Sequence, residues 1–351
     1  MEMGGFADLP VIDCHVHFTP SPKRAEDDIT KFGAFMAEVM ERGRVAQAYL
    51  SGDWGGLLLK ARYAGRYYAG GKVPWCGQKA AAAAAPNWRT CLEGLMAAGF
   101  DGIGEMGSKP AKREQFTPLA GPFYAGFWRY CESRRVPILC HVADPEEFWT
   151  PDVAPDWARS RGWVYGPGHP SKEELYADLE TVLGRHPEMS LVLAHLNFFS
   201  ADPDRAESFY RKYAHVAFDL TPGIEMFWNM TKARDRWRKF FVTHQDRLLF
   251  GTDIAPWQSV EQALARIWTV RAFLEKDGEF TTPDEADELM TRYDRPFRGL
   301  GLPPEVLEKI YATNFQRIFG KQARPTDLRL AANLAAEDGA EALAALLRGA
   351  G

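Results

Sequence analysis

The chain has 351 residues, enough for one large α/β barrel or for two ordinary domains. Hydrophobic residues make up 46% and charged residues 25% of it, the balance of a soluble globular protein with ample core. The formal net charge of -5 excludes the strongly basic surface that nucleic acids and anionic membranes attract, so we expect neither as a partner.

The cysteines and the amino terminus indicate the compartment. The odd number of cysteines and the lack of a CxxC pair are typical of reduced thiols in a cytoplasmic protein. The amino terminus lacks a basic region followed by an apolar run, and no segment reaches the length of a membrane span. We therefore expect a cytoplasmic localisation.

The first predicted strand, 9–18, ends with two histidines one residue apart, in LPVIDCHVHF. Side chains at i and i+2 of a strand point to the same face, so His15 and His17 should lie side by side, as metal ligands do. A bare His-x-His also occurs where two polar residues merely end a strand. Cys14 and Cys140, each just before a candidate ligand, should point the opposite way into the core.

The segment after this strand carries weaker signals. Residues 19–28 are rich in proline and charge and predict a loop, and residues 29–50 show the apolar spacing of a helix. Residues 51–80 mix glycine, tryptophan and tyrosine in a way that defines no elements, although 72–78 resembles a strand. We expect a lid-like insertion at about 19–80.

Strands and helices alternate through the rest of the chain, and several strands end on a residue that can bind a metal. Strand 100–106 ends near Glu105, strand 136–140 is followed by His141, strand 190–194 by His195, and strand 247–251 by Asp253. A further strand is predicted at 215–220, and helices at 87–99, 123–135, 172–185, 205–213, 231–245, 259–276 and 304–319.

Two segments should lie outside this alternation. Residues 142–171 have the prolines, glycines and aromatic residues of a functional loop, and we expect them to form a lid. Ser171 should then cap the next helix, with Glu174 completing a capping box. The alanine-rich tail 325–351, with a helix near 336–348, should be peripheral.

Strands that alternate with helices of this length imply parallel βαβ units. About 300 residues of such units, with reactive side chains at strand ends, predict a (β/α)8 TIM barrel with long loop insertions over its carboxyl edge, where such barrels place their chemistry. We therefore expect a single barrel domain over 1–351.

The ordered set VIDCHVHF, VPILCHV, LVLAHL, VAFDLT, LLFGTD and ATNFQRIFG resembles the metal-dependent amidohydrolase superfamily. The similarity is to the branch that contains aminocarboxymuconate-semialdehyde decarboxylase, resorcylate decarboxylases and lactonases, and it spans roughly residues 9–320. It implies that His15, His17, His141, His195 and Asp253 surround a metal, and that Asp253 also handles the proton of a bound water.

The fourth strand leaves two interpretations open. Many members of the branch carry a lysine-containing GIK-type sequence there, whereas GIGEMG is similar to the IGE motif of TatD-type deoxyribonucleases, whose glutamate bridges two metals. Glu105 is either such a ligand or an acceptor that orients a histidine from outside. His195 follows the same choice: it joins His141 on a second ion, or it contacts the water or the substrate carbonyl at a single ion.

Imidazole and carboxylate ligands suit a divalent ion, with zinc expected first and manganese or iron as alternatives, in one or two sites. Such an ion lowers the pKa of bound water to about 7, which makes hydroxide available at neutral pH. A neighbouring carboxylate can take the proton and return it to a leaving group. We expect Asp253 and His195 to be the catalytic residues.

Three functions are compatible with this set. The first is hydrolysis of a small amide, ester or lactone by a metal-bound hydroxide. The second is non-oxidative decarboxylation of an aromatic or enoic acid, in which the metal holds the acid and Asp253 transfers a proton to carbon, with Arg159 or Arg161 as a nearby cation for the carboxylate. The third is a non-catalytic, metal-stabilised scaffold, although structural zinc sites are normally closed by four protein ligands. We expect a small-molecule substrate and a homo-oligomer.

Other polar and aromatic residues lack this strand-end context. Asp219 and Glu225 flank the outlet of the seventh strand and either line the pocket or face solvent. We expect the remaining histidines to be exposed or structural: His169, His186, His215 and His244. Five tryptophans should rise above the carboxyl edge as pocket walls or exposed residues: Trp149, Trp157, Trp163, Trp228 and Trp257.

Overall fold

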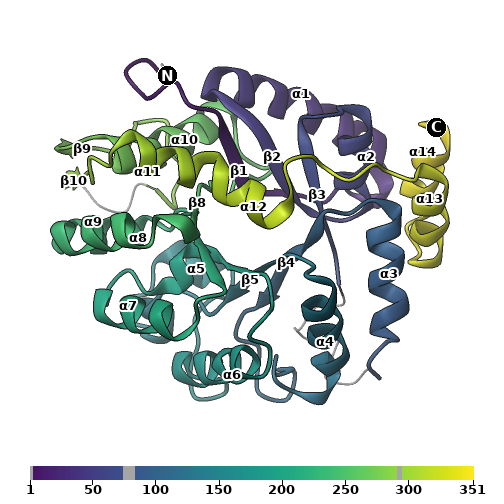
Figure 1. The fold of residues 1–351 in the computed structure, drawn as a ribbon, viewed down its shortest axis with the longest axis horizontal. Helices are drawn as coiled ribbons and strands as arrows, with labels where there is room; N and C mark the ends of the chain where they lie inside the picture. Colours follow the sequence, from purple (N-terminus) through teal and green to yellow (C-terminus); the bar gives the residue numbers. More distant parts are fainter. Residues whose placement is uncertain (1–2, 74–83, 291–294) are drawn as a thin grey trace.

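The computed structural model describes residues 3–73, 84–290 and 295–351. Eight parallel strands pair in sequence order and curl into a barrel (Figure 1). They are β1 (Val11–Phe18), β2 (Val45–Gly52), β3 (Tyr67–Gly71), β4 (Gly102–Ser108), β5 (Ile138–Val142), β6 (Leu191–Leu193), β7 (Val216–Asp219) and β8 (Leu248–Leu249). The expected (β/α)8 barrel is confirmed.

The last strand is short, and the segment after it joins the first strand. The backbone N–H of Cys14 donates to the carbonyl of Phe250 at 3.0 Å, and that of His17 donates to the carbonyl of Ile254 at 2.7 Å. Between them, the N–H of Asp253 donates to the carbonyl of His15 at 3.0 Å. These bonds bring the histidines at the end of β1 beside Asp253.

Helices cover the outside of the sheet and bury their apolar faces against it in one large cluster. The helices between and after the strands are α1 (Ala25–Gly43), α2 (Trp54–Arg62), α3 (Trp88–Ala98), α4 (Ala125–Arg134), α6 (Lys172–Arg185), α7 (Pro203–Lys212), α8 (Ile224–Lys232), α9 (Arg234–Thr243), α10 (Val260–Glu275), α11 (Pro304–Glu308) and α12 (Asn314–Phe319).

The interior of the barrel is filled from its amino-terminal end. Phe315 and Phe319 of α12 pack with Tyr49 and Tyr68 in the interior cluster, and Cys14 lies in the same cluster. The Asn314 amide donates to the carbonyl of Leu248 at the start of β8, at 2.8 Å, and thereby ties α12 to this strand. With this end plugged, polar side chains can gather only at the carboxyl ends of the strands.

Much of the segment 19–80, expected as a lid-like insertion, belongs to the barrel wall instead. The helix expected over 29–50 ends at Gly43, because Arg44 adopts a left-handed conformation with φ of 53° and its N–H returns to the helix carbonyls. Residues 45–52 then form β2, and α2 and β3 follow. Residues 74–78 of the strand expected at 72–78 lie outside the described ranges.

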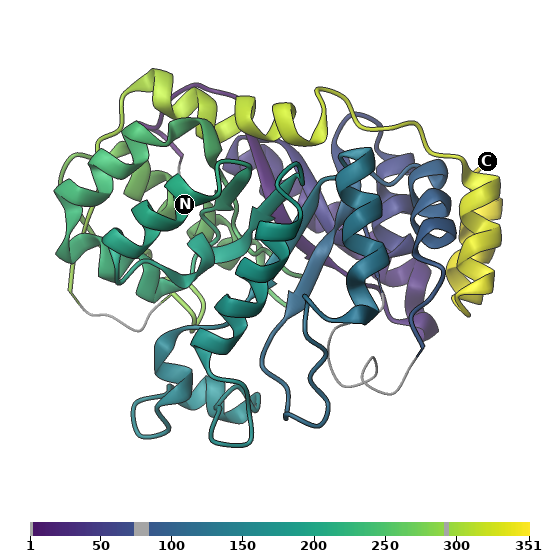
Figure 2. The same cartoon turned by 60° about the horizontal axis from the view of Figure 1, so that its bottom comes forward.

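The segment 142–171 projects from the body of the molecule (Figure 2). It contains the short helix α5 (Asp156–Ser160) and a small apolar cluster of Phe148, Ala158 and Tyr165. The capping box that begins α6 is present, with Ser171 and Glu174 each bonded to the other's backbone. Whether this segment acts as a lid stays a prediction.

The tail forms two helices, α13 (Leu328–Glu337) and α14 (Glu341–Gly349), where the sequence predicted one. They pack on each other and lie beside α2 and α3 at the edge of the barrel (Figure 1). The indole N–H of Trp54 donates to Asp338 between them, at 2.9 Å. Among the described residues, no helix combines the length and apolar character needed to cross a bilayer.

Candidate metal centre

The end of β1 places two imidazoles at the carboxyl edge of the barrel. The Nε2 atoms of His15 and His17 lie 3.1 Å apart, as the i and i+2 spacing predicts. The His15 side chain is fully buried, whereas 30% of the His17 side chain is exposed. The imidazole of His15 therefore lies at the buried side of the centre, and that of His17 lies at its accessible side.

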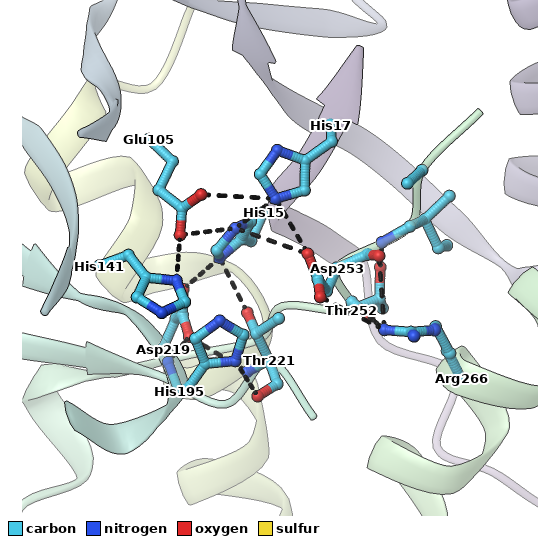
Figure 3. Close-up of polar contacts among 12 residues, drawn as sticks. His15, His17, Glu105, His141, His195, Asp219, Thr221, Thr252, Asp253 and Arg266 are labelled. Atoms are coloured by element: carbon cyan, nitrogen blue, oxygen red, sulfur yellow. Dashed lines mark hydrogen bonds and ion pairs between the residues drawn. The ribbon is translucent and has the colours of Figure 1, made fainter. Parts of the chain in front are cut away.

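Glu105 of β4 lies between these histidines and His141 of β5 (Figure 3). Its Oε1 atom is 2.8 Å from Nδ1 of His141 and 3.5 Å from Nε2 of His15. Its Oε2 atom is 3.5 Å from Nε2 of His17. A single carboxylate thus contacts ligand-type nitrogens from two strands.

His195 enters from the segment that follows β6. Residues 195–198 adopt consecutive left-handed backbone conformations, with φ between 51° and 54°. This turn brings the His195 ring to a centroid distance of 4.7 Å from the His141 ring and 5.6 Å from the His15 ring. The order of the strand-end motifs predicted that His195 belongs to the site, but nothing in the sequence indicates its left-handed backbone conformation.

Asp253 completes the ring of side chains from the segment after β8. Its Oδ1 atom lies 2.9 Å from Nε2 of His17 and 3.9 Å from Nε2 of His15. The guanidinium of Arg266 is 3.6 Å from its Oδ2 atom. Asp253 has a φ of 60°, so the backbone is turned sharply at this residue.

The buried carboxylate of Asp13 holds the backbone next to Asp253. Oδ1 of Asp13 accepts the N–H of His15 at 3.1 Å and that of Thr252 at 3.2 Å. Burial raises the pKa of Asp13 to about 7, against the opposing effect of its bond with the Thr252 hydroxyl. Asp13 therefore ties the GTD segment to β1 from outside the ring of imidazoles.

Each buried imidazole has one nitrogen bonded to an oxygen outside the cluster. Nδ1 of His15 lies 2.8 Å from Oδ2 of Asp219, and Nδ1 of His195 lies 3.1 Å from the carbonyl of Thr221. Nε2 of His141 lies 3.4 Å from Oδ1 of Asp144. These oxygens hold the outer nitrogen of each ring, so that the opposite nitrogen faces the cluster.

The electrostatics of the cluster favour a cation among these side chains. Burial lowers the pKa of His15, but Glu105 and Asp219 outweigh it and raise that pKa to about 10. Burial, with the neighbouring His141, lowers the pKa of His195 to about 4, so this ring is neutral near pH 7. The pKa of Glu105 is held well below its ordinary value, despite burial, by the three imidazoles around it.

The donor set fits divalent cations. The inward ring nitrogens lie beside carboxylate oxygens, and a bound divalent cation would replace the protons that these groups share. Two groups have all their ligand atoms within 4.8 Å of one another: His15, His17 and Glu105, and Glu105, His141 and His195. Glu105 is common to both. Neutral imidazole and carboxylate are the ligands that zinc and similar ions take.

The structure thus brings together all six residues that the sequence predicted as metal ligands. Three supporting residues were not predicted from the sequence: Asp13, Asp144 and Arg266. Asp219 was expected to line the pocket or face solvent, and both expectations are wrong, because it is fully buried behind His15. Its burial depends on a partner 204 residues away, which local sequence does not reveal.

Other candidates lie away from this cluster. Cys14 and Cys140 are buried in apolar clusters, as expected. The side chains of His186 and His244 pair with Glu132 and Glu207, at 2.8 and 2.7 Å, while His169 packs against Tyr165. Trp149, Trp157 and Trp163 gather in the segment 142–171, Trp228 is half-buried, and Trp257 is 73% exposed.

The chain belongs to the amidohydrolase family, whose model, described as "Amidohydrolase", matches residues 89–321. No curated protein matches the chain. Three of the solved structures that share its fold illustrate the likeness. A 2,6-dihydroxybenzoate decarboxylase from Rhizobium is 15% identical with a TM-score of 0.50, over 89% of this chain and 98% of that one.

The second structure is 4-oxalomesaconate hydratase from Rhodopseudomonas palustris, which is 14% identical with a TM-score of 0.50, over 94% of this chain and 99% of that one. The third, a dihydroxybenzoic acid decarboxylase from Polaromonas sp. JS666 with bound manganese and the inhibitor 2-nitroresorcinol, is 12% identical with a TM-score of 0.50, over 89% and 97%. At these identities the likeness establishes the fold.

Proposed function

We propose that the chain is a metal-dependent hydrolase that holds two divalent ions and acts on a small amide, ester or lactone. The observation that carries this proposal is the position of Glu105. Its carboxylate contacts His15 and His17 on one side and His141 on the other, at 2.8 to 3.5 Å. A carboxylate in this position is suited to bridging two ions.

In this proposal, His15, His17 and Asp253 would hold the first ion, His141 and His195 would hold the second, and Glu105 would be shared. Ions bound there would supply an acidified water and polarise the carbonyl of the substrate. Zinc is our first expectation, and the manganese in the Polaromonas structure makes manganese the first alternative to test.

The open side of the centre lies at His17 and Asp253. Their side chains are 30% and 23% exposed, whereas His15 and Asp219 are fully buried. Water and substrate therefore approach next to the Asp253 carboxylate. Because His17 and Arg266 hold the pKa of Asp253 well below its usual range despite burial, the carboxylate is ionised and can accept a proton. Returning that proton to the leaving group completes hydrolysis.

Decarboxylation is the second candidate, since two of the structures that share the fold are decarboxylases of dihydroxybenzoic acids. In that reaction the metal would hold the acid, with a nearby arginine as a further cation for the carboxylate. Arg161 instead pairs with Glu288 at 2.6 Å, and Arg159 lies 3.6 Å from Asp156. Within the described ranges, neither arginine is paired with a residue of the centre. Decarboxylation would therefore depend on the metal alone to hold the carboxylate, and product analysis distinguishes it from hydrolysis.

A metal-stabilised scaffold is the third candidate. Its metal would be enclosed by protein ligands, as in structural zinc sites. The exposure of His17 and Asp253 argues instead for a centre that keeps an accessible side.

Counting metal ions and identifying products test this proposal together. Elemental analysis of wild-type protein loaded with zinc or manganese should give two ions per chain, and Glu105→Ala should give one or none. Glu93→Ala, which removes an exposed glutamate paired with Arg89 on α3, is the matched control and should keep two. A single ion in the wild-type chain contradicts the proposal.

Loaded enzyme should then be screened with esters, lactones and amides and, separately, with aromatic acids. Uptake of water into the product supports hydrolysis, whereas release of carbon dioxide supports the second candidate. Absence of turnover on both panels, together with a large loss of melting temperature in His17→Ala, would support the scaffold.

A further inference from the structure

The segment 142–171 begins at the last residue of β5, the strand that carries His141. Asp144 lies three residues beyond this histidine. Its side chain is only 3% exposed. A buried carboxylate at this position requires partners, and it has three.

The first partner is His141. Oδ1 of Asp144 lies 3.4 Å from Nε2 of this imidazole, while the opposite nitrogen of the ring, Nδ1, lies 2.8 Å from Glu105. The ring is thus held between two carboxylates, one inside the cluster and one outside it. A hydrogen bond to the outer nitrogen fixes both the tautomer and the orientation of a ligand histidine.

The other partners come from two separate loops. The hydroxyl of Tyr165, near the far end of the segment 142–171, donates to Oδ2 of Asp144 at 2.5 Å. The ammonium of Lys109, which directly follows β4, lies 3.2 Å from Oδ1. The same ammonium is 4.0 Å from the centroid of the Trp163 ring, so the segment also packs on this lysine.

Both loops therefore converge on one carboxylate behind His141. Its Oδ1 faces His141 and Lys109, and its Oδ2 accepts the Tyr165 hydroxyl, so each oxygen has a fixed partner. The apolar cluster of Phe148, Ala158 and Tyr165 keeps Tyr165 in place at the other end of this connection.

We propose that Asp144 is a positioning residue for the second ion: it holds His141 with Nδ1 toward Glu105, and through Tyr165 and Lys109 it makes the affinity for that ion depend on the segment 142–171. This inference rests on the proposed two-ion function. It assigns to the projecting segment a role in metal binding that is separate from covering the substrate.

Metal binding without substrate tests this inference. Metal-free wild type, Asp144→Asn and Tyr165→Phe are titrated with Zn²⁺ by equilibrium dialysis, with bound ions counted by elemental analysis. In Asp144→Asn the first ion should bind as in wild type, and the second about 10- to 100-fold more weakly. Tyr165→Phe, which removes one hydroxyl, should weaken the second ion in the same direction by a smaller factor.

Two matched variants serve as controls. Asp178→Asn alters a carboxylate that accepts backbone N–H groups of Leu119 and Ala120, and Tyr213→Phe removes a hydroxyl bonded to Glu180. Both should bind two ions like wild type. Circular dichroism and melting temperature verify folding, and Tyr165→Phe carries the test should Asp144→Asn fail to fold.

The outcomes separate this inference from the function on which it rests. Two ions with unchanged affinities in both Asp144→Asn and Tyr165→Phe overturn the inference and leave the two-ion function intact. A single ion in the wild-type chain overturns both. Equal weakening of the two ions in Asp144→Asn also overturns the inference, because it indicates a general structural effect.

Discussion

Oδ2 of Asp219 lies 2.8 Å from Nδ1 of His15, although 204 residues separate the two in the chain. Oδ1 of the same carboxylate accepts the backbone N–H of His195 at 2.8 Å and that of Thr221 at 3.1 Å. Burial raises the pKa of Asp219, but His15 outweighs it, so that the pKa is lowered and the side chain is charged. One buried carboxylate at the end of β7 therefore orients the ring of one proposed ligand and the backbone of another.

Asp219→Asn should weaken metal binding by about 10- to 100-fold, because the amide is a weaker acceptor for the His15 ring and carries no charge. Equilibrium dialysis with Zn²⁺ measures this loss. Asp246→Asn, at an exposed carboxylate near Lys309, is the control and should bind metal like wild type. Unchanged affinity in Asp219→Asn would show that His15 is oriented without help from this carboxylate.

Asp253→Asn should keep most of the bound metal but lower kcat by about 10²- to 10⁴-fold, because the amide cannot accept the proton of the attacking water. The comparison requires metal content and turnover to be measured on the same preparation. Asp235→Asn, on the exposed side of α9, should leave both unchanged. Wild-type turnover in Asp253→Asn at full metal content would remove Asp253 from the role of proton acceptor.

The positions of the six candidate ligands were predictable because each depends on local sequence. His15 and His17 follow from the period of two in a strand, and Glu105, His141 and Asp253 lie where apolar runs end. Parallel strands that close a barrel bring such ends to one edge, so the order of the motifs predicted a cluster. Local patterns do not reveal the partner of each ligand. Asp219 lies 204 residues from His15, and the contact of Asp144 with His141, three residues away, depends on the left-handed backbone of Ala143 between them.

The errors in the fold have a related cause. Strand β2 is VAQAYLSG and β3 is YYAGG, and neither has a run of β-branched residues. Both strands are held by their neighbours in the barrel, because β2 pairs with β1 and β3 pairs with β2. Such strands are defined by tertiary pairing, and in isolation their sequence is equally compatible with a helix or a loop. For this reason the sequence predicts an insertion at 19–80, where the structure has β2 and β3 of the barrel.

Glu225→Gln should make the protein more stable at pH 8 than wild type, and the gain should disappear near pH 4.5. Burial raises the pKa of Glu225 to about 7 from an ordinary value of 4.5, and Lys172 offsets only part of this effect. Between these values the folded state holds a proton that the unfolded chain releases, so the free energy of unfolding of wild type falls as pH rises. The full pKa difference corresponds to about 3 kcal/mol, and for a half-buried carboxyl we expect about 1 kcal/mol.

Urea unfolding of the metal-loaded proteins from pH 4.5 to 8 tests the prediction for Glu225. The quantity compared is the free energy of unfolding of the variant minus that of wild type, because the contribution of the titrating metal ligands is the same in both and cancels. Glu173→Gln is an informative control. Bonds from the Arg205 guanidinium lower the pKa of Glu173, so Glu173→Gln should be less stable than wild type by a constant amount from pH 8 down to about 4.5, and this difference should shrink only at lower pH. A difference for Glu225→Gln that is constant across the range would show that its carboxyl titrates normally.

Arg266 connects Asp253 to the segment between α10 and α11. Its guanidinium is buried, with Nε 2.7 Å and Nη2 3.2 Å from the Asp287 carboxylate, and Nη1 donates to the carbonyl of Thr252 at 3.1 Å. Arg266→Met should lower the free energy of unfolding by about 3 to 5 kcal/mol, since it leaves Asp287 without its cation. Arg211→Met, which breaks an exposed pair with Glu207 on α7, should cost about 0.5 kcal/mol or less.

Arg266→Lys separates stability from catalysis at the same position. Lysine keeps the charge near Asp287 but cannot donate to Asp287 and to the Thr252 carbonyl with the fixed geometry of a guanidinium. We therefore expect a smaller loss of stability, measured by urea unfolding, together with a clear fall in kcat, because the Asp253 segment is less well fixed. If kcat stays at the wild-type value while stability falls, then Asp13 and the His17 contact are sufficient to place Asp253, and Arg266 serves only to hold the outer segment.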